Sequence, residues 1–287
     1  MDAVKMCRLL ETYSRVVFFC AILCASIFIN TNAFASQRVY TIGVVPQFTP
    51  LTIHRSWGPF IDRLSQETGI KFRLRVYPNF KQFLSDVRRG EPDFVFLAPF
   101  HAVIAHKEQG YVPLIRDDAN KLVGLLVVRK DSPITSVNAL DGKRISFPSP
   151  NAFAASIYMR AYLSEKEDIK FIPRYVGTHD NVYRHVLVKL SAAGGGVNKT
   201  LIRQPVNLRD KLRVLYQLPG VAAHPISAHP RVPKTIQEKF VTTIMDLHAS
   251  NIEKSLLTKV QLRRPIRADY NRDYQFLEDL NLEKYMN

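Results

Sequence analysis

The chain has 287 residues, with 40 Lys and Arg against 25 Asp and Glu and a formal net charge of +15 at pH 7. This positive balance favours an anionic ligand or an anionic surface as partner. The basic residues are scattered, with no run longer than Leu-Arg-Arg, which argues against nucleic-acid binding.

Residues 1–35 resemble a secretory signal peptide. Lys5, Arg8 and Arg15 make a basic start, an apolar run of 14 residues follows at 16–29, and Ala33-Phe-Ala35 forms a small-x-small cleavage site. The run is too short for a typical membrane span and is followed by polar residues. We therefore expect export to the periplasm and a mature chain that begins at Ser36; an uncleaved anchor is the weaker alternative.

The predicted mature chain contains no cysteine, because Cys7, Cys20 and Cys24 all lie in the signal segment. Disulfide bonds, a thiol nucleophile and a cysteine metal site are therefore excluded for it. The remaining 252 residues carry a charge of +14. They suffice for a sizeable core, in one large domain or in two lobes.

Strands and helices alternate along residues 39–115. Apolar segments predict strands at 39–45, 72–77, 94–97 and 112–115. Between them, a helical stripe ends at Gly69, a second helix is capped by Asn79 and closed by Gly90, and a third runs to Gly110. Residues 98–101 are expected to form the loop after the third strand. This rhythm indicates an α/β fold.

The second half of the chain opens with a longer apolar strand at 122–129, which we interpret as a crossover into a second lobe. The segment 145–156 then predicts a strand, a Pro-Ser-Pro-Asn turn and a helix with Asn151 as its N-cap. A strand at 170–175, a helix capped by Asp180, a glycine turn at 194–196 and a return crossing at 212–220 follow. Helices around 236–247 and 274–280 complete the prediction.

Two crossings between two groups of elements predict two lobes. Lobe 1 would comprise residues 36–128 and 219–287, and lobe 2 residues 129–218. Ligands of open α/β sheets bind beyond the carboxyl ends of the strands. Loops 46–50, 98–101 and 148–153 and the pair Thr178-His179 are expected to converge there.

Six short motifs resemble, in order and spacing, the phosphate/phosphite/phosphonate-binding proteins of ABC importers, which are type II periplasmic binding proteins. The motifs are Gly43-Val-Val-Pro46, Asp93-Phe-Val-Phe-Leu-Ala-Pro99, Val127-Val-Arg-Lys-Asp-Ser132, Leu140-Asp-Gly-Lys143, Phe147-Pro-Ser-Pro150 and Gly177-Thr-His179. The resemblance covers about residues 40–218. It implies two lobes, each with a mostly parallel sheet flanked by helices, and two hinge crossings.

The resemblance also implies a function. The cleft would close on a small phosphorus oxyanion (phosphate, phosphite or phosphonate) and the protein, expected to be a monomer, would deliver it to an ABC permease. An alternative is a sensory protein that presents the same bound form to a membrane signalling partner; a periplasmic enzyme acting on a phosphonate is a third possibility.

The sequence departs from the family pattern at three places. Where the family has hydroxyl residues over the helix start, this chain has Ala152, Phe153 and Ala154. His101 stands where the family tends to have tyrosine. Ala193 stands where many members carry an acidic residue that would pair with a substrate amine.

The candidate ligand-binding residues come from the converging loops. Ser149 and Asn151 either bind a ligand oxygen or only cap the turn. The resemblance favours His101 and His179 as ligand contacts, and backbone N–H groups at the helix start would bind an anion. Phe48, Phe100 and Phe153 either wall the cleft or belong to the core. The full set is Gln47, Phe48, Thr49, Phe100, His101, Ser149, Asn151, Ala152, Phe153 and His179.

Enzymatic motifs are missing from the sequence. It contains no Gly-x-Ser-x-Gly elbow, His-Glu-x-x-His or P-loop. His224, His229 and His248 lack metal-ligand spacing, and the first two, each followed by proline, predict loop turns. We therefore expect no catalytic residue, metal or cofactor.

Overall fold

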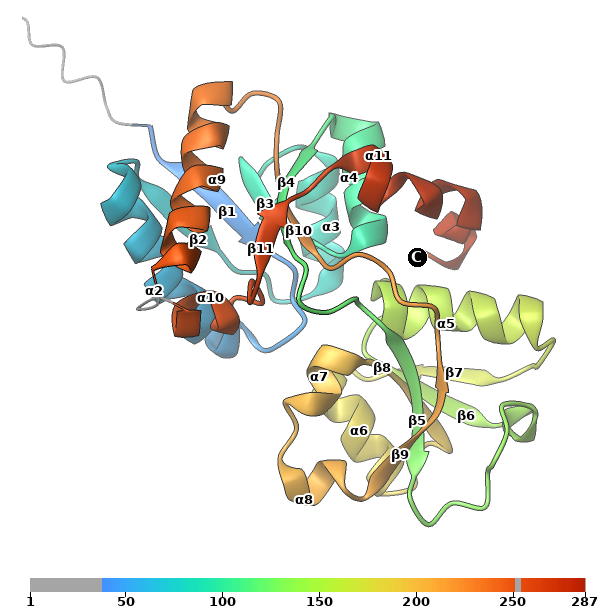
Figure 1. Cartoon of the computed structure of the whole chain (residues 1–287). Coiled ribbons are helices and arrows are strands. Elements are labelled where there is room, and N and C mark those ends of the chain that lie inside the picture. The colour runs from blue at the N-terminus through green and yellow to red at the C-terminus, as the bar shows by residue number, and fades with distance from the viewer. Residues whose placement is uncertain (1–37, 251–253, 287) are drawn as a thin grey trace, which may run out of the picture. The chain divides into compact units, whose positions relative to one another are not determined.

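The computed structural model describes residues 38–250 and 254–286 and contains two β-sheets with helices packed against them (Figure 1). The predicted α/β class is confirmed. The predicted signal peptide lies outside the described residues. Within the described residues, no helix is both long and apolar enough to cross a membrane.

The six-stranded sheet has the strand order β11-β4-β10-β3-β1-β2. Its parallel pairs are β1 with β2 and β1 with β3, whereas β10 and β11 return antiparallel to their neighbours. The strands are β1 (Tyr40–Val44), β2 (Phe72–Arg75), β3 (Phe94–Phe96), β4 (Val112–Asp117), β10 (Pro225–Ala228) and β11 (Pro265–Arg267).

The helices of this half follow the predicted caps. Asn79 accepts a hydrogen bond from the Gln82 amide at 2.9 Å, and Gly69 ends its helix in the left-handed region at φ 66°. The helices are α2 (Pro50–Thr68), α3 (Phe80–Arg88), α4 (Pro99–Gln109), α9 (Lys234–Ala249), α10 (Lys254–Lys259) and α11 (Tyr270–Asp273), with 3₁₀ turns η5 (Gln275–Leu280) and η6 (Leu282–Tyr285).

The prediction of a loop at 98–101 was wrong. Helix α4 begins at Pro99, with Ala98 as its N-cap. Proline is favoured at the first helical position because its missing N–H would have no partner there anyway. Phe100 and His101 therefore lie in the first helical turn.

The five-stranded sheet has the strand order β7-β6-β8-β5-β9. Strand β6 pairs parallel with β7 and β8, and β5 pairs antiparallel with β8 and β9. Its elements are β5 (Gly124–Arg129), η1 (Asn138–Leu140), β6 (Arg144–Phe147), η2 (Phe153–Ile157), α5 (Tyr158–Ala161), η3 (Tyr162–Lys166), β7 (Ile172–Tyr175), α6 (His179–Leu187), β8 (Ala193–Val197), α7 (Asn198–Ile202), α8 (Val206–Arg209) and β9 (Leu212–Gln217).

The glycine run 194–196 is not a turn, as the sequence suggested, but the middle of the fully buried strand β8. Glycine is required there because neighbouring groups approach the backbone closely. A Cβ atom on Gly195 would lie 2.6 Å from Cδ1 of Phe147 and would overlap the carbonyl oxygen of Ala155. The strand therefore allows the helix that follows β6 to approach the sheet.

Two segments join the sheets, one between β4 and β5 and one between β9 and β10 (Figure 1). They pair with each other through an antiparallel bridge between Leu122 and Val221, with backbone hydrogen bonds of 2.9 and 3.0 Å. The lobe boundaries expected at 128/129 and 218/219 stay a prediction. These paired crossings are where a hinge would lie.

Candidate functional site

The helix after β6 starts with backbone donors that have no partner. Ala152 is its N-cap, rather than the predicted Asn151, and no side chain caps it. The Ala152 amide donates to the Ser149 carbonyl at 3.3 Å, and its own carbonyl accepts from Ser156 and Ile157. The amides of residues 153–155 make no hydrogen bond to another described residue. The Ala152 amide, predicted to bind the ligand, is thus already bonded, whereas these three amides have no partner among the described residues.

These amides belong to a continuous helical segment, 153–166, in which η2 and η3 are wider turns of the π type on either side of α5. Such turns are uncommon and occur often at functional sites. The side chain of Arg160 holds the preceding loop in place by donating to the Pro150 carbonyl at 2.6 Å. The loop before the helix start is therefore held by the Arg160 side chain and by the Ala152–Ser149 backbone hydrogen bond.

A small cavity, here called the helix-start cavity, adjoins this helix start. Its volume is about 20 Å³, room for about one water molecule. None of its lining side chains is an acid, a lysine or an arginine. The lining residues are Val45, Gln47, Phe80, Ala98, Leu122, Ala152, Phe153, Ala154, Ala155, His179, Val197 and His224.

The polar side chains of the helix-start cavity are held by a hydrogen-bond network. Gln47 bonds the Nε2 atom of His224 at 2.8 Å and accepts from Gln261 at 2.9 Å. In the half that contains the five-stranded sheet, the Nδ1 atom of His179, the first residue of α6, lies 3.4 Å from the hydroxyl of Thr200 in α7. The cavity is therefore lined by neutral polar groups in fixed positions.

Burial keeps these histidines neutral. It lowers the pKa of His179 to about 4, against a smaller opposing effect of Asp180. Burial also lowers the pKa of His224 well below its usual value, and the positive charge of Lys199 adds to the fall. At neutral pH each imidazole therefore offers one donor and one acceptor and no charge.

His179 was predicted to lie just before a helix capped by Asp180, but it is itself the first residue of α6. Thr178 caps this helix, accepting from the Asn181 amide at 3.2 Å. The threonine hydroxyl performs the capping role that the sequence assigned to Asp180. His179 is 3% exposed and faces the helix-start cavity.

His101 and Phe100 line neither this cavity nor the outer cleft described below. His101 is 1% exposed, and neither ring nitrogen makes a hydrogen bond to a described residue. Burial lowers its pKa to about 4; the nearby Asn151 backbone opposes this fall without meeting the geometry of a hydrogen bond. Phe100 stacks on Phe153 with ring centroids 5.9 Å apart, joining the two sheets' helices.

A larger space, the outer cleft, has a volume of about 460 Å³ and holds four predicted residues: Phe48, Thr49, Ser149 and Asn151. Thr49 caps α2 by accepting from the Thr52 amide at 3.3 Å. The Ser149 hydroxyl accepts from the Asn151 amide at 3.2 Å. Both hydroxyls thus already accept a hydrogen bond from a nearby backbone amide. Of the predicted set, only Gln47, Ala152, Phe153 and His179 line the helix-start cavity.

Sequence reasoning missed His224. The His-Pro pair predicted a turn, but His224 directly precedes β10, which runs antiparallel to β3. The start of an antiparallel strand lies beside the carboxyl ends of its parallel neighbours, and that brings His224 to the cavity. The sequence of β10, four residues that begin with proline, contains no pattern that predicts an antiparallel strand.

In the described part of the chain, no group of three or more His, Cys, Asp or Glu side chains is arranged to hold a metal ion. The arrangement at the helix start is instead suited to binding. Unpartnered N–H groups at a helix N-terminus, together with the positive end of the helix dipole, attract an anion.

Comparison with known proteins agrees with this fold. The model of a family described as "ABC transporter, phosphonate, periplasmic substrate-binding protein" matches residues 42–274. The chain is 22% identical over 270 residues to the phosphonates-binding periplasmic protein of Escherichia coli (strain K12), covering 89% of this chain and 79% of that protein.

Two solved structures share the fold. One is a binding-protein component of an ABC phosphonate transporter from Pseudomonas aeruginosa, with a TM-score of 0.76, 18% identity and coverage of 86% of this chain and 87% of that one. The other is PhnD1 from Prochlorococcus marinus in complex with methylphosphonate, with a TM-score of 0.75, 17% identity and coverage of 86% and 98%.

These relatives are substrate-binding components of transporters and not enzymes, which fits the prediction that this protein is no enzyme. The predicted resemblance and the type II periplasmic binding protein fold are confirmed. The chain belongs to the family of phosphonate-binding periplasmic proteins of ABC transporters.

Proposed function

We propose that this protein captures a small phosphonate without an amino group, such as methylphosphonate, and delivers it to an ABC permease. The phosphonate oxygens would accept from the amides of residues 153–155, with His179, His224 and Gln47 as side-chain contacts. The observation that supports this most is the helix start itself: three successive N–H groups without a partner border a cavity.

The lining of the cavity favours a ligand without an ammonium group. No carboxylate from the described residues lines it, and residue 193, where a family acid would be expected, is a buried alanine in β8. A ligand ammonium would be buried there without an opposite charge, which is costly. The apolar side chains of Phe80, Val45 and Val197 suit an alkyl group instead.

Binding would require the two halves of the molecule to move. The cavity of about 20 Å³ holds one water, less than a phosphonate needs. The Phe100–Phe153 stack, with ring centroids 5.9 Å apart, is one of the contacts between the two halves that would have to change. A hinge motion about the paired crossings would open the cavity and close it again on the ligand, as in other two-lobed binding proteins.

Calorimetry tests the proposal. The protein would be titrated with methylphosphonate, 2-aminoethylphosphonate, phosphate, phosphite and sulfate. We expect methylphosphonate to bind most tightly and, at about a hundredfold over its dissociation constant, to stabilise the fold by about 2.7 kcal/mol. Tighter binding of 2-aminoethylphosphonate, or of sulfate, would overturn the ligand class. Stimulation of a reconstituted permease ATPase by the loaded protein would test delivery.

A further inference from the structure

A second space between the two halves is basic. This pocket, here called the basic pocket, has a volume of about 260 Å³. It shares no lining residue with the helix-start cavity or with the outer cleft. Its lining residues are Asp117, Asn120, Asn198, Lys199, Ile202, Arg203, Thr258, Gln261 and Arg263.

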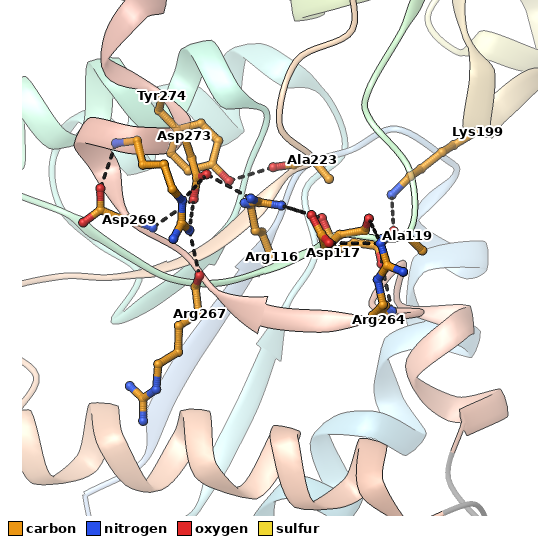
Figure 2. Close-up of polar contacts among 12 residues, drawn as sticks. Arg116, Asp117, Ala119, Lys199, Ala223, Arg264, Arg267, Asp269, Asp273 and Tyr274 are labelled. Atoms are coloured by element: carbon orange, nitrogen blue, oxygen red, sulfur yellow. Dashed lines mark hydrogen bonds and ion pairs between the residues drawn. The ribbon is translucent and has the colours of Figure 1, made fainter.

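Among the described residues, the only acid that lines the basic pocket is already fully engaged. Asp117 is 1% exposed and pairs with the Nζ atom of Lys199 at 3.2 Å, as Figure 2 shows. Its other contacts are backbone amides, those of Ala119 at 3.2 Å and Arg264 at 2.9 Å. Asp117 therefore balances the charge of Lys199, and no acid among the described residues pairs with the other two cations.

Those two cations are Arg203 and Arg263. Among the described residues, the Arg203 side chain makes one hydrogen bond, to the Lys259 carbonyl at 3.3 Å, and it lies over the ring of Phe48. No hydrogen bond or ion pair joins the Arg263 side chain to another described residue. The three cations repel one another: burial lowers the pKa of Lys199, and the charges of Arg203 and Arg263 lower it further, against the opposing effect of Asp117.

We propose that the basic pocket binds a small multivalent oxyanion of the phosphate type. The planar guanidinium forks of Arg203 and Arg263 would donate paired hydrogen bonds to its oxygens, a geometry that suits phosphate. The amide side chain of Asn120 lines the pocket as a further donor, whereas those of Asn198 and Gln261 already donate to the Lys121 carbonyl and to Gln47, each at 2.9 Å. The bound anion replaces the missing negative charge and relieves the repulsion between the cations.

The position of the pocket gives this anion a second effect. Asp117, Asn120 and Arg263 are attached to the six-stranded sheet, whereas Lys199 and Arg203 follow β8 of the five-stranded sheet. An anion bound to both arginines connects the two halves beside the crossings. It therefore favours the closed arrangement in which both sides contribute contacts.

The test uses inorganic phosphate as probe, measured by calorimetry at low salt. In Arg203→Gln/Arg263→Gln, which keeps the side chains polar, we expect phosphate affinity to fall at least about tenfold. Lys130→Gln removes one exposed cation at the far end of β5 and should leave it unchanged. The NMR-measured pKa of Lys199 should rise when phosphate binds, because an anion stabilises its charged form.

Three results would overturn the proposal: no measurable phosphate binding, the same affinity in the double variant, or a Lys199 pKa that phosphate does not move. Measuring methylphosphonate binding in the same variants distinguishes this site from the helix-start cavity. The double variant should keep its methylphosphonate affinity within about twofold. If the wild-type protein binds phosphate but does not bind methylphosphonate, only the proposed function is contradicted.

Discussion

The helix-start cavity and the basic pocket differ in the charge of the groups that line them. The cavity offers backbone amides, two neutral histidines and a glutamine, without a charged side chain in its lining. The basic pocket presents three cations and one acid that is already paired. The cavity has about 20 Å³ of space, and the basic pocket has about 260 Å³.

This difference shows why net charge is a poor guide to the location of an anion site. The charge of +15 favours an anionic ligand, yet no Lys or Arg among the described residues lines the cavity that the helix start borders. A buried cation without a partner would be costly whenever the cavity is empty. Neutral donors avoid that cost and can still bind an anion when it arrives.

The largest expected effect concerns the strand that shapes the cavity. In Gly195→Ala the added Cβ meets Phe147 at 2.6 Å and the carbonyl of Ala155, so the helix start must shift. We expect a loss of at least about 3 kcal/mol in the free energy of unfolding, measured with urea. Gly142→Ala is the control: with φ of +67° and open space around it, it should cost about 1 kcal/mol. Equal costs would contradict the tight fit at β8.

Filling the cavity should separate the two sites. Ala154 is 4% exposed and lines the cavity, so Ala154→Leu would occupy the space for the ligand. We expect methylphosphonate affinity to fall at least about a hundredfold, equivalent to about 2.7 kcal/mol. Phosphate binding to the basic pocket should persist. Calorimetry measures both, and undiminished methylphosphonate binding would place the ligand elsewhere.

Acid should destabilise the protein through its buried histidines. Burial lowers the pKa of His101 to about 4, below its ordinary value of 6.5, so the folded state favours the neutral ring. The resulting stability is fully present above pH 6.5 and is lost as the pH falls toward 4, at about 1.4 kcal/mol for each unit of pKa depression.

His101→Leu isolates this contribution. The variant removes a buried imidazole whose nitrogens have no hydrogen bond to a described residue, so its stability at pH 7 should be equal or higher. Its loss of stability between pH 7 and pH 4.5 should be smaller than that of wild type in urea unfolding. An unchanged pH dependence would contradict the assignment. Methylphosphonate affinity should stay within about twofold, because His101 does not line the cavity.

The smallest expected effect is the response of the cavity to salt. Between 20 and 300 mM NaCl, methylphosphonate affinity should change by less than about threefold, because buried neutral donors are little screened. Phosphate affinity at the exposed cations of the basic pocket should fall at least about tenfold over the same range. Equal salt dependence in calorimetry would mean that both anions occupy one kind of site.

Much of the fold follows from local patterns. The Asn79 cap, the Gly69 stop and the alternation of strands and helices are local features, and the structure has them. The glycine run 194–196 was wrongly predicted as a turn because the contacts that require glycine come from residues far away in the sequence. Gly195 is needed where Phe147 and Ala155 approach the strand. His224 was missed for a similar reason, since its place depends on the antiparallel return of β10.

The most direct test of the helix-start account is NMR of the backbone amides during a methylphosphonate titration. The account predicts saturable downfield shifts of the amide protons of Phe153, Ala154 and Ala155, as expected for donors to an anion. The amides of Asn198 and Lys199 at the basic pocket should move little. Saturable binding that leaves residues 153–155 unshifted would contradict the central claim that this helix start holds the ligand.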